Sequence, residues 1–163
     1  MVDCGELWKK NKGPPVSSFK GSYRYAVDEK GRVSIPARMR KYLSPEANET
    51  FVITRGTETC LFLFPLDEWE KLENRLKELN TFNPEHRFLI RVLLMWAVEV
   101  TLDNQSRIMI PRNLLEFAKI EKEVLMIGTL DKIEIWNPDI YEQYIASQPE
   151  NYEKVVEKVL GMK

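Results

Sequence analysis

The sequence predicts an α+β fold in which one module, a β-hairpin, a helix, a second β-hairpin and a second helix, occurs twice. The strongest observation is an internal repeat, because Asp28–Pro36 returns 75 residues later as Asp103–Pro111 with its acid, arginine, strand isoleucine and proline in register. Short alternating runs around both copies are typical of strands, and apolar residues three and four apart indicate helices. Because one copy buries little apolar surface, we expect the two to pack together with pseudo-twofold symmetry and extra helices.

The first copy opens with a predicted basic hairpin and a short helix. Residues 23–27 alternate large and small side chains, and Gly31 supplies a turn residue that tolerates a positive φ. The second strand, residues 32–35, alternates polar and apolar side chains, so its arginine and serine share one face. A proline with a φ suited to a first helical turn then begins a helix over residues 36–43.

The rest of the first copy predicts a second hairpin and two longer helices. Residues 51–54 and 61–64 are short β-rich runs joined by a glycine-containing turn. A helix is expected over 66–79, with its tryptophan and leucines on one face. Asn83 caps a second helix over 84–97, which is apolar on most sides and should therefore be central or lie at an interface.

The second copy repeats these elements in the same order. Residues 124–128 align with 52–56 at an offset of 72, which predicts that the second copy has lost three residues in the loop 44–50. A last helix is expected to be capped around Pro149 and to end at Leu160. The other matched segments are 99–102 with 24–27, 114–118 with 39–43, and 133–136 with 61–64.

These elements divide the chain into five expected segments. The leader has little apolar periodicity and contains the run Gly13–Pro15, so we expect it to be flexible. The segments are a flexible leader 1–18, a first domain 19–66, a helical hairpin linker 67–97, a second domain 98–141 and a C-terminal helix 142–163.

Composition is that of an ordinary globular protein, with 44% hydrophobic and 30% charged residues among 163. The longest apolar run, Val92–Val98, is far shorter than the roughly 20 residues of a membrane-spanning helix. Cys4 and Cys60 have no zinc-binding spacing, and reduced thiols in a cytoplasm are their simplest explanation. We therefore expect a cytoplasmic protein with no membrane partner.

Positive charge is concentrated in the first copy although the net charge of the chain is −1. Between Lys20 and Leu43 there are seven basic and two acidic residues, whereas residues 100–118 carry two of each. A basic module in a nearly neutral protein is typical of a surface that attracts a polyanion. The first copy is therefore expected to contribute more phosphate binding than the second.

The motifs of an enzyme are missing from the sequence. It has no glycine-rich phosphate loop and no G-x-S-x-G motif, and its carboxylates alternate with lysines on helix faces as solvated charge does. His86 is the single histidine and has no cluster of metal-ligating residues around it. We expect no catalytic residue, no metal and no cofactor.

The repeated motif points to a known family. The segment 19–23, the run Val27–Pro36 and the second Asp103-x-x-x-Arg107 copy resemble the MraZ family of bacterial transcriptional regulators. Each half is similar to a swapped-hairpin barrel domain of the AbrB and SpoVT type, and the resemblance covers about residues 19–160. The family usually begins near Phe19, so the leader departs from its pattern.

The resemblance implies a cytoplasmic, nucleoid-associated protein that binds double-stranded DNA. It further implies a closed homo-oligomeric ring that recognises short promoter repeats ahead of a division and cell-wall gene cluster. The family's D-x-x-x-R arginines fall on Arg32 and Arg107. The full set of predicted DNA-binding residues is Lys20, Arg24, Lys30, Arg32, Arg38, Arg107 and Arg112.

Two roles are open for Arg32 and Arg107. Each guanidinium could contact phosphate or guanine, or it could form an ion pair with Asp28 or Asp103 that fixes the turn. The residue pattern alone favours the ion pair, and the resemblance favours DNA contact with the aspartates as structural partners. Both roles can coexist because a guanidinium has five donors.

Two functions from different classes follow. One is a sequence-specific DNA-binding regulator that uses a basic hairpin face on an oligomer. The other is an oligomeric, antitoxin-like interaction module whose duplicated hairpin contacts a protein partner.

Overall fold

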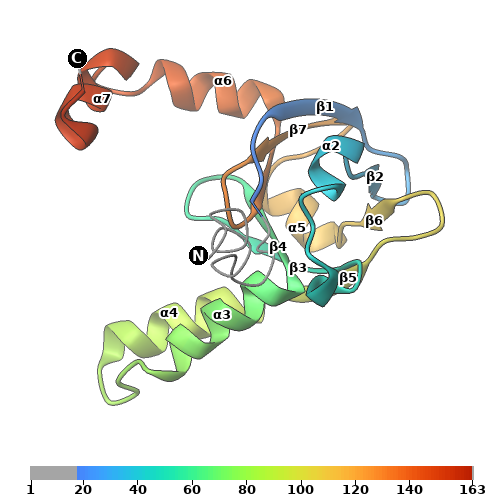
Figure 1. Cartoon of the computed structure of the whole chain (residues 1–163), viewed down its shortest axis with the longest axis horizontal. Coiled ribbons are helices and arrows are strands. Elements are labelled where there is room, and N and C mark those ends of the chain that lie inside the picture. The colour runs from blue at the N-terminus through green and yellow to red at the C-terminus, as the bar shows by residue number, and fades with distance from the viewer. Residues whose placement is uncertain (1–17, 163) are drawn as a thin grey trace, which may run out of the picture.

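The computed structural model describes residues 18–162, so the predicted leader lies outside the described residues except for Ser18 (Figure 1). The strands are β1 (Ser22–Ala26), β2 (Arg32–Ser34), β3 (Thr50–Arg55), β4 (Leu61–Pro65), β5 (Val98–Thr101), β6 (Arg107–Met109), β7 (Glu123–Gly128) and β8 (Ile133–Trp136). The helical elements are α2 (Ala37–Arg40), the 3₁₀ turn η1 (Pro45–Ala47), α3 (Leu66–Lys77), α4 (Pro84–Met95), α5 (Arg112–Phe117), α6 (Pro138–Ala146) and α7 (Tyr152–Leu160).

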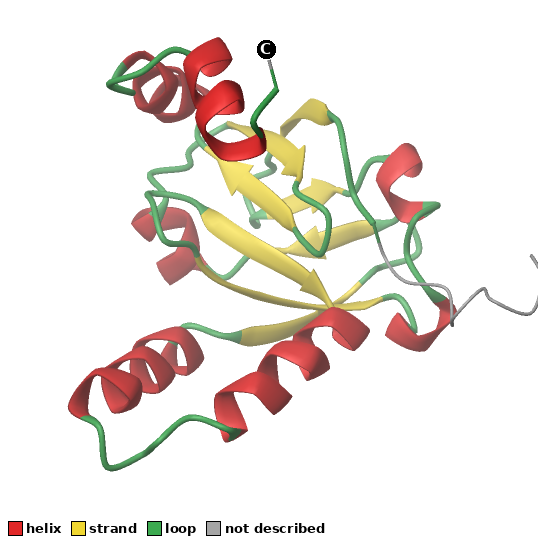
Figure 2. Cartoon of the chain, turned by 60° about the vertical axis from the view of Figure 1, so that its left-hand side comes forward, coloured by secondary structure: helices red, strands yellow, loops and turns green. Residues whose placement is uncertain are grey.

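The strands form two antiparallel sheets that confirm the predicted α+β fold and its duplication (Figure 2). The larger sheet has the order β1-β7-β8-β4-β3-β5, and β2 pairs with β6 in a separate ribbon. If each strand is exchanged for its counterpart in the other copy, β1 for β5, β2 for β6, β3 for β7 and β4 for β8, the order of the larger sheet simply reverses. The fold therefore has pseudo-twofold symmetry.

The position of the pseudo-twofold axis follows from the strand register. Val33 lies opposite Ile108 in the ribbon, and these two residues occupy the same place in the two copies. Phe62 lies opposite Glu134 between β4 and β8, and they too are counterparts. The axis therefore passes through the centre of the β2–β6 ribbon at one end and between β4 and β8 at the other.

The copies interlock, because the first predicted hairpin of each copy does not close on itself. β1 pairs with β7 and β5 pairs with β3, so the outer strands of each copy complete the sheet of the other. Only β3–β4 and β7–β8 pair within a copy, as local hairpins. The other ladders, β1–β7, β3–β5, β2–β6 and β4–β8, all need both copies. The division of the chain into domains at residues 66, 97 and 141 stays a prediction.

The predicted offset of 72 is wrong for β7 by one residue. Tyr25 pairs with Val124 where its counterpart Val100 pairs with Phe51, so Val124 corresponds to Phe51 at an offset of 73. Side chains alternate between the faces of a sheet, so this shift restores Val124 to the buried face that Phe51 occupies. The second copy therefore lost two residues before β7 and one between β7 and β8.

The helix after each ribbon strand begins one residue later than predicted and is short. Pro36 and Pro111 are N-caps with extended ψ values of 136° and 144°, rather than first helical residues. The predicted helix over 36–43 is helical only over Ala37–Arg40. Beyond it the N–H of Leu43 donates to the carbonyl of Arg40, which is a tighter i→i+3 turn.

The longer helices agree with the sequence pattern. The Asn83 side chain accepts a hydrogen bond from the N–H of Glu85 at 2.9 Å and caps α4, as expected. In the C-terminal region the predicted cap near Pro149 is wrong, because the Asn151 side chain caps α7 instead. An asparagine side chain satisfies a helix N-terminus better than a glutamine or proline can.

The larger of two core clusters in residues 18–162 lies between the larger sheet, the ribbon and the short helices, and a smaller one around Trp69 lies under α3. Apolar residues from both copies contribute to the larger cluster in matched positions: Val33, Ile35, Met39, Phe51 and Ile53 from the first, and Ile108, Ile110, Leu114, Val124 and Met126 from the second. Trp69 and Trp136 are also buried, and Trp96 is partly buried against the Phe117 ring.

Candidate nucleic-acid interface

The two repeated turns have the same hydrogen bonds. In the first, Asp28 Oδ1 accepts from the backbone N–H groups of Lys30 and Arg32 at 3.0 and 2.8 Å, and Oδ2 accepts from Arg32 Nε at 2.7 Å. In the second, Asp103 Oδ1 accepts from the N–H groups of Gln105 and Arg107 at 2.8 and 3.0 Å, and Oδ2 accepts from Arg107 Nε at 3.0 Å. Each aspartate therefore fixes both the turn and its arginine.

Each turn is also held by the opposite copy. Gly31 has a φ of 81° and its counterpart Ser106 a φ of 59°, so both turns pass through the left-handed region. The carbonyl of Gly31 accepts from Ile110 N at 2.9 Å, and the carbonyl of Ser106 accepts from Ile35 N at 3.0 Å. These bonds extend the β2–β6 ladder into the turns and make the two turns one rigid unit.

The same donors shift the ionisation of the aspartates. The backbone N–H of Arg32 is the main cause that holds the pKa of Asp28 below its usual value, and the Arg32 side chain and the N–H of Lys30 add to it. The backbone N–H of Arg107 acts in the same way on the pKa of Asp103. A lowered pKa means that the carboxylate form is bound more favourably in the folded state than in the unfolded state.

The lowered pKa values predict a pH dependence of stability. The contribution is present above the unfolded pKa of about 3.9 and is lost as the pH falls through the lower folded values. The double variant Asp28→Asn, Asp103→Asn should therefore be less stable than the wild type at neutral pH, with a difference that shrinks below about pH 4. Urea unfolding from about pH 7 to 2 measures it, and a difference that stays constant would contradict this account.

The outer face of the ribbon brings the two arginines together. Arg32 lies opposite Met109 and Ser34 lies opposite Arg107, so all four side chains share one face. Val33 and Ile108 point the other way and are only 1% exposed. The Arg32 and Arg107 side chains are 31% and 25% exposed. In each of these two arginines, Nε donates to the aspartate of the same turn. Among residues 18–162 no hydrogen bond engages the terminal amino groups, so these can donate to a ligand.

Three further predicted cations lie on or directly after this ribbon. Lys30 is exposed in the first turn, and Arg38 is exposed on α2, the helix that follows β2. Arg112 is the first residue of α5, the helix that follows β6, and pairs with Glu116 at 3.2 Å. Lys20 precedes β1 and is therefore not part of the ribbon. Its Nζ lies 5.3 Å from the centre of the Tyr42 ring.

Arg24 has a different environment from the other predicted residues. Its guanidinium lies 3.4 Å from Glu142 on α6 and 3.9 Å from Glu123 on β7. It also lines a polar depression with Glu121 and Asp139. Arg24 is therefore surrounded by carboxylates and is not among the residues that the ribbon brings together.

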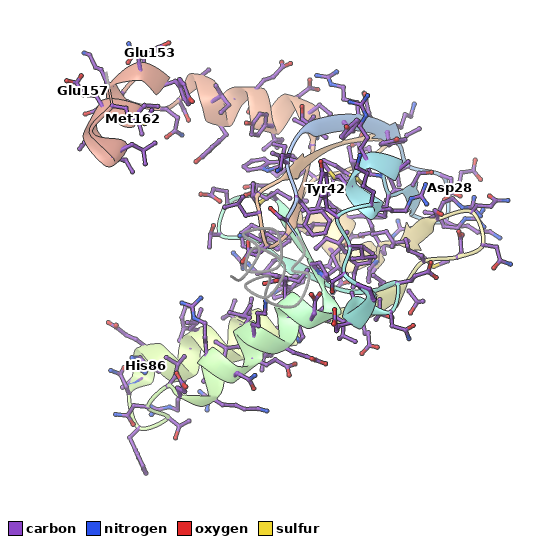
Figure 3. All side chains as sticks on the ribbon, in the orientation of Figure 1. Asp28, Tyr42, His86, Glu153, Glu157 and Met162 are labelled. Atoms are coloured by element: carbon purple, nitrogen blue, oxygen red, sulfur yellow. The ribbon has the colours of Figure 1, made fainter. Side chains whose placement is uncertain are left out.

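The helical pairs lie on the opposite side of the molecule from the ribbon. Figure 1 shows α3 with α4 and α6 with α7 as two arms that extend away from β2 and β6. In Figure 3, Asp28 marks the ribbon side, and His86 and Glu153 mark the two arms. The ribbon is therefore open to a large partner without obstruction by the arms.

The histidine and the described cysteine have structural surroundings rather than those of a metal site. Among residues 18–162, no three histidine, cysteine or acidic residues are grouped as metal ligands would be. His86 Nδ1 accepts from Asn80 N at 3.0 Å and closes the loop between α3 and α4. Burial raises the pKa of Cys60 to about 12. No helix within this range has the length and apolar character needed to cross a bilayer.

Met109 is the one member of the ribbon face that the sequence analysis missed. Because Arg107 and Met109 are two residues apart in a strand, the alternation that paired Arg32 with Ser34 could have placed Met109 there. Its position beside Arg32 could not be found in this way, since that depends on pairing between copies.

The fold and its paired turns define a class of protein: a duplicated, swapped-hairpin fold that presents two aspartate-held arginines on one ribbon. The family model described as "MraZ protein, putative antitoxin-like" matches residues 18–92 and 93–162, one match for each copy. The chain belongs to the MraZ family, as the sequence motif indicated.

Similar proteins cover most of the chain. A protein of Pelotomaculum thermopropionicum named transcriptional regulator MraZ is 41% identical over 144 residues, which is 88% of this chain and 97% of the relative. Proteins of the same name from Caldanaerobacter subterraneus subsp. tengcongensis and Alkaliphilus oremlandii are 42% and 43% identical over 137 and 141 residues. They cover 84% and 86% of this chain, and 93% and 96% of their own lengths. The name describes a regulator rather than an enzyme, in agreement with the prediction.

Proposed function

We propose that this protein is a transcriptional regulator that binds double-stranded DNA with the outer face of the β2–β6 ribbon. The observation that carries the proposal is the pair of arginines, Arg32 and Arg107, held by aspartates on one partly exposed face around the pseudo-twofold axis. The name shared by the relatives supports the same function.

The geometry of the ribbon suits the major groove of DNA. A two-stranded β-ribbon fits into this groove, which is about 12 Å wide, and arginine donates two hydrogen bonds to guanine O6 and N7. Asp28 and Asp103 accept hydrogen bonds from Nε of Arg32 and Arg107. These bonds fix the orientation of each guanidinium, so that its terminal amino groups are already positioned before DNA binds. Preorganised donors lose less conformational entropy when they bind.

The cations around the ribbon would contact phosphates rather than bases. Lys30, Arg38 and Arg112 lie on or next to the ribbon, with Lys20 as a fourth candidate, and such contacts position a protein on the duplex without reading its sequence. Arg24 is left outside the proposed interface, because it lies on β1 in the larger sheet, beside Glu123 and Glu142, rather than on the ribbon.

We further propose that the protein assembles into a ring through the helical arms. On α4, Phe88, Leu89 and Met95 are exposed, and this helix has no fully buried residue. Between α6 and α7 an apolar groove of about 740 Å³ is lined by Tyr144, Tyr152 and Val155. Two different apolar surfaces on one subunit favour head-to-tail contacts, which close into a ring when the rotation between subunits allows it.

A ring would present several ribbons to DNA at once. Few phosphates are within reach of one subunit, and linked binding events raise the overall affinity well above that of a single contact. Following the family resemblance, we propose short promoter repeats ahead of a division and cell-wall gene cluster as the target. The protein would then act in the cytoplasm, at the nucleoid.

The salt dependence of DNA binding tests this function. Each phosphate neutralised on B-DNA contributes about −0.9 to the slope of log affinity against log salt concentration. Four phosphate contacts predict a slope of roughly −3 to −4 for each bound subunit. The measurement is a fluorescence anisotropy titration of wild-type protein on a duplex selected from a random-sequence library, between about 50 and 200 mM salt.

The same titration separates the two classes of function. Tight binding to a selected duplex with a steep salt slope supports the regulator. If the wild-type protein selects no duplex even at low salt, the DNA-binding function is wrong and the antitoxin-like interaction module becomes the better explanation.

A further inference from the structure

The ribbon is symmetric in its backbone but not in its outward side chains. Arg32 and Arg107 are counterparts, whereas Ser34 in the first copy corresponds to Met109 in the second. The ladder places Met109 directly opposite Arg32, and Ser34 directly opposite Arg107. One arginine therefore has an apolar cross-strand neighbour and the other has a polar one.

Met109 has no role in the core that would explain it. Its side chain is 54% exposed, while the flanking residues Ile108 and Ile110 are buried. It also lies far from the exposed apolar residues of the helical arms (Figure 1). Single exposed apolar residues are common on protein surfaces. What distinguishes Met109 is its position directly opposite Arg32 on the face that carries the two arginines.

We propose that Met109 determines specificity by contacting the 5-methyl group of a thymine, next to the base pair that Arg32 reads. This inference rests on the proposed DNA-binding function. The thymine methyl is the apolar group that base pairs present in the major groove, and a flexible thioether side chain can pack against it. Directly opposite residues in a ladder lie ~5 Å apart, close to the ~3.4 Å rise between base pairs, so Arg32 and Met109 reach neighbouring pairs.

The consequence is that the ribbon has a direction on DNA. The two arginines alone would bind a sequence equally well in either orientation, because the pseudo-twofold axis exchanges them. Met109 breaks this equivalence, since Ser34 offers no apolar surface beside Arg107. A thymine next to only one of the two arginine-contacted base pairs then fixes the orientation of the protein.

Deoxyuridine substitution tests the contact one methyl group at a time. In a duplex selected by the wild-type protein, each thymine is replaced in turn by deoxyuridine, which lacks only the 5-methyl group. We expect the wild type to lose about fourfold in affinity at one thymine, the effect of one buried methyl. The Met109→Ser variant, which copies the residue found at Ser34, should bind the two duplexes equally, and Met109→Leu should keep the preference.

Matched controls separate the possible outcomes. Ser34→Ala changes the counterpart position and should keep the full preference for thymine, and equal urea midpoints of all variants confirm folding. A wild type that binds the selected duplex but ignores every methyl would overturn the inference and leave the proposed function intact. An undiminished preference in Met109→Ser would overturn it as well, because another residue would then contact the methyl. Failure of the wild type to select any duplex would remove the proposed function, and this inference with it.

Discussion

Replacing Arg32 and Arg107 together by alanine is expected to lower the affinity for the selected duplex by about a thousandfold. Each bidentate arginine–guanine contact is worth ~1–3 kcal/mol, and ~1.4 kcal/mol corresponds to a tenfold change in affinity. Both contacts lie on one ribbon face, so the double variant removes the centre of the proposed interface in every subunit. Anisotropy titration at one fixed salt concentration measures the loss.

The double variant should still fold and assemble. Asp28 keeps two backbone donors after the arginine side chain is removed, and Asp103 does the same in the second copy. The ladder between β2 and β6 involves the backbone and is unaffected. We therefore expect an unchanged oligomer mass, so that weaker binding reports on contact with DNA rather than on loss of structure.

A control with the same change in charge makes this result decisive. Arg24→Ala with Lys122→Ala also removes two positive charges, at the β1–β7 edge where Arg24 is paired with carboxylates. This variant should lose less than about threefold in affinity, because neither residue lies on the ribbon and carboxylates already offset the charge of Arg24. Normal DNA binding by the arginine double variant, or an equal loss in the control, would count against the ribbon as the DNA-binding face.

The repeat and the local patterns were enough to predict the fold class. Val33 and Ile35 alternate with polar residues and are buried as expected, and their counterparts in the second copy behave alike. The Asn83 cap was predicted because capping depends on neighbouring residues only. These features are local, and local chemistry determines them.

The pairing between copies could not be predicted from the same patterns. A strand with alternating side chains can pair with any other strand that buries its apolar side chains on the same face of the sheet. Nothing in residues 22–26 therefore specifies that they pair with β7 rather than with β2. The one-residue error in the β7 alignment has the same origin, because register is set by a partner far away in the sequence.

In the candidate site, too, contacts between residues close in sequence could be predicted, and contacts between distant segments could not. Asp28 and Arg32 are four residues apart, so both their mutual contact and a role in binding could be predicted from the motif. The acidic surroundings of Arg24 could not be predicted, because Glu142, its neighbour in space, is 118 residues away in the chain. Met109 was overlooked because its position beside Arg32 exists only once β6 has paired with β2.

Site-directed crosslinking tests most directly whether the ribbon touches DNA. A cysteine replaces Ser34 on the ribbon face, or Gln143 on α6 as a control, in a chain with Cys4→Ser. Cys60 can remain, because it is fully buried and burial raises its pKa to about 12. The probe is the selected duplex with a disulfide-activated tether on one base of the site. We predict a covalent protein–DNA product with Ser34→Cys and none with Gln143→Cys. A product from Gln143→Cys alone, with both variants binding the duplex, would contradict the assignment of the ribbon as the DNA-binding surface.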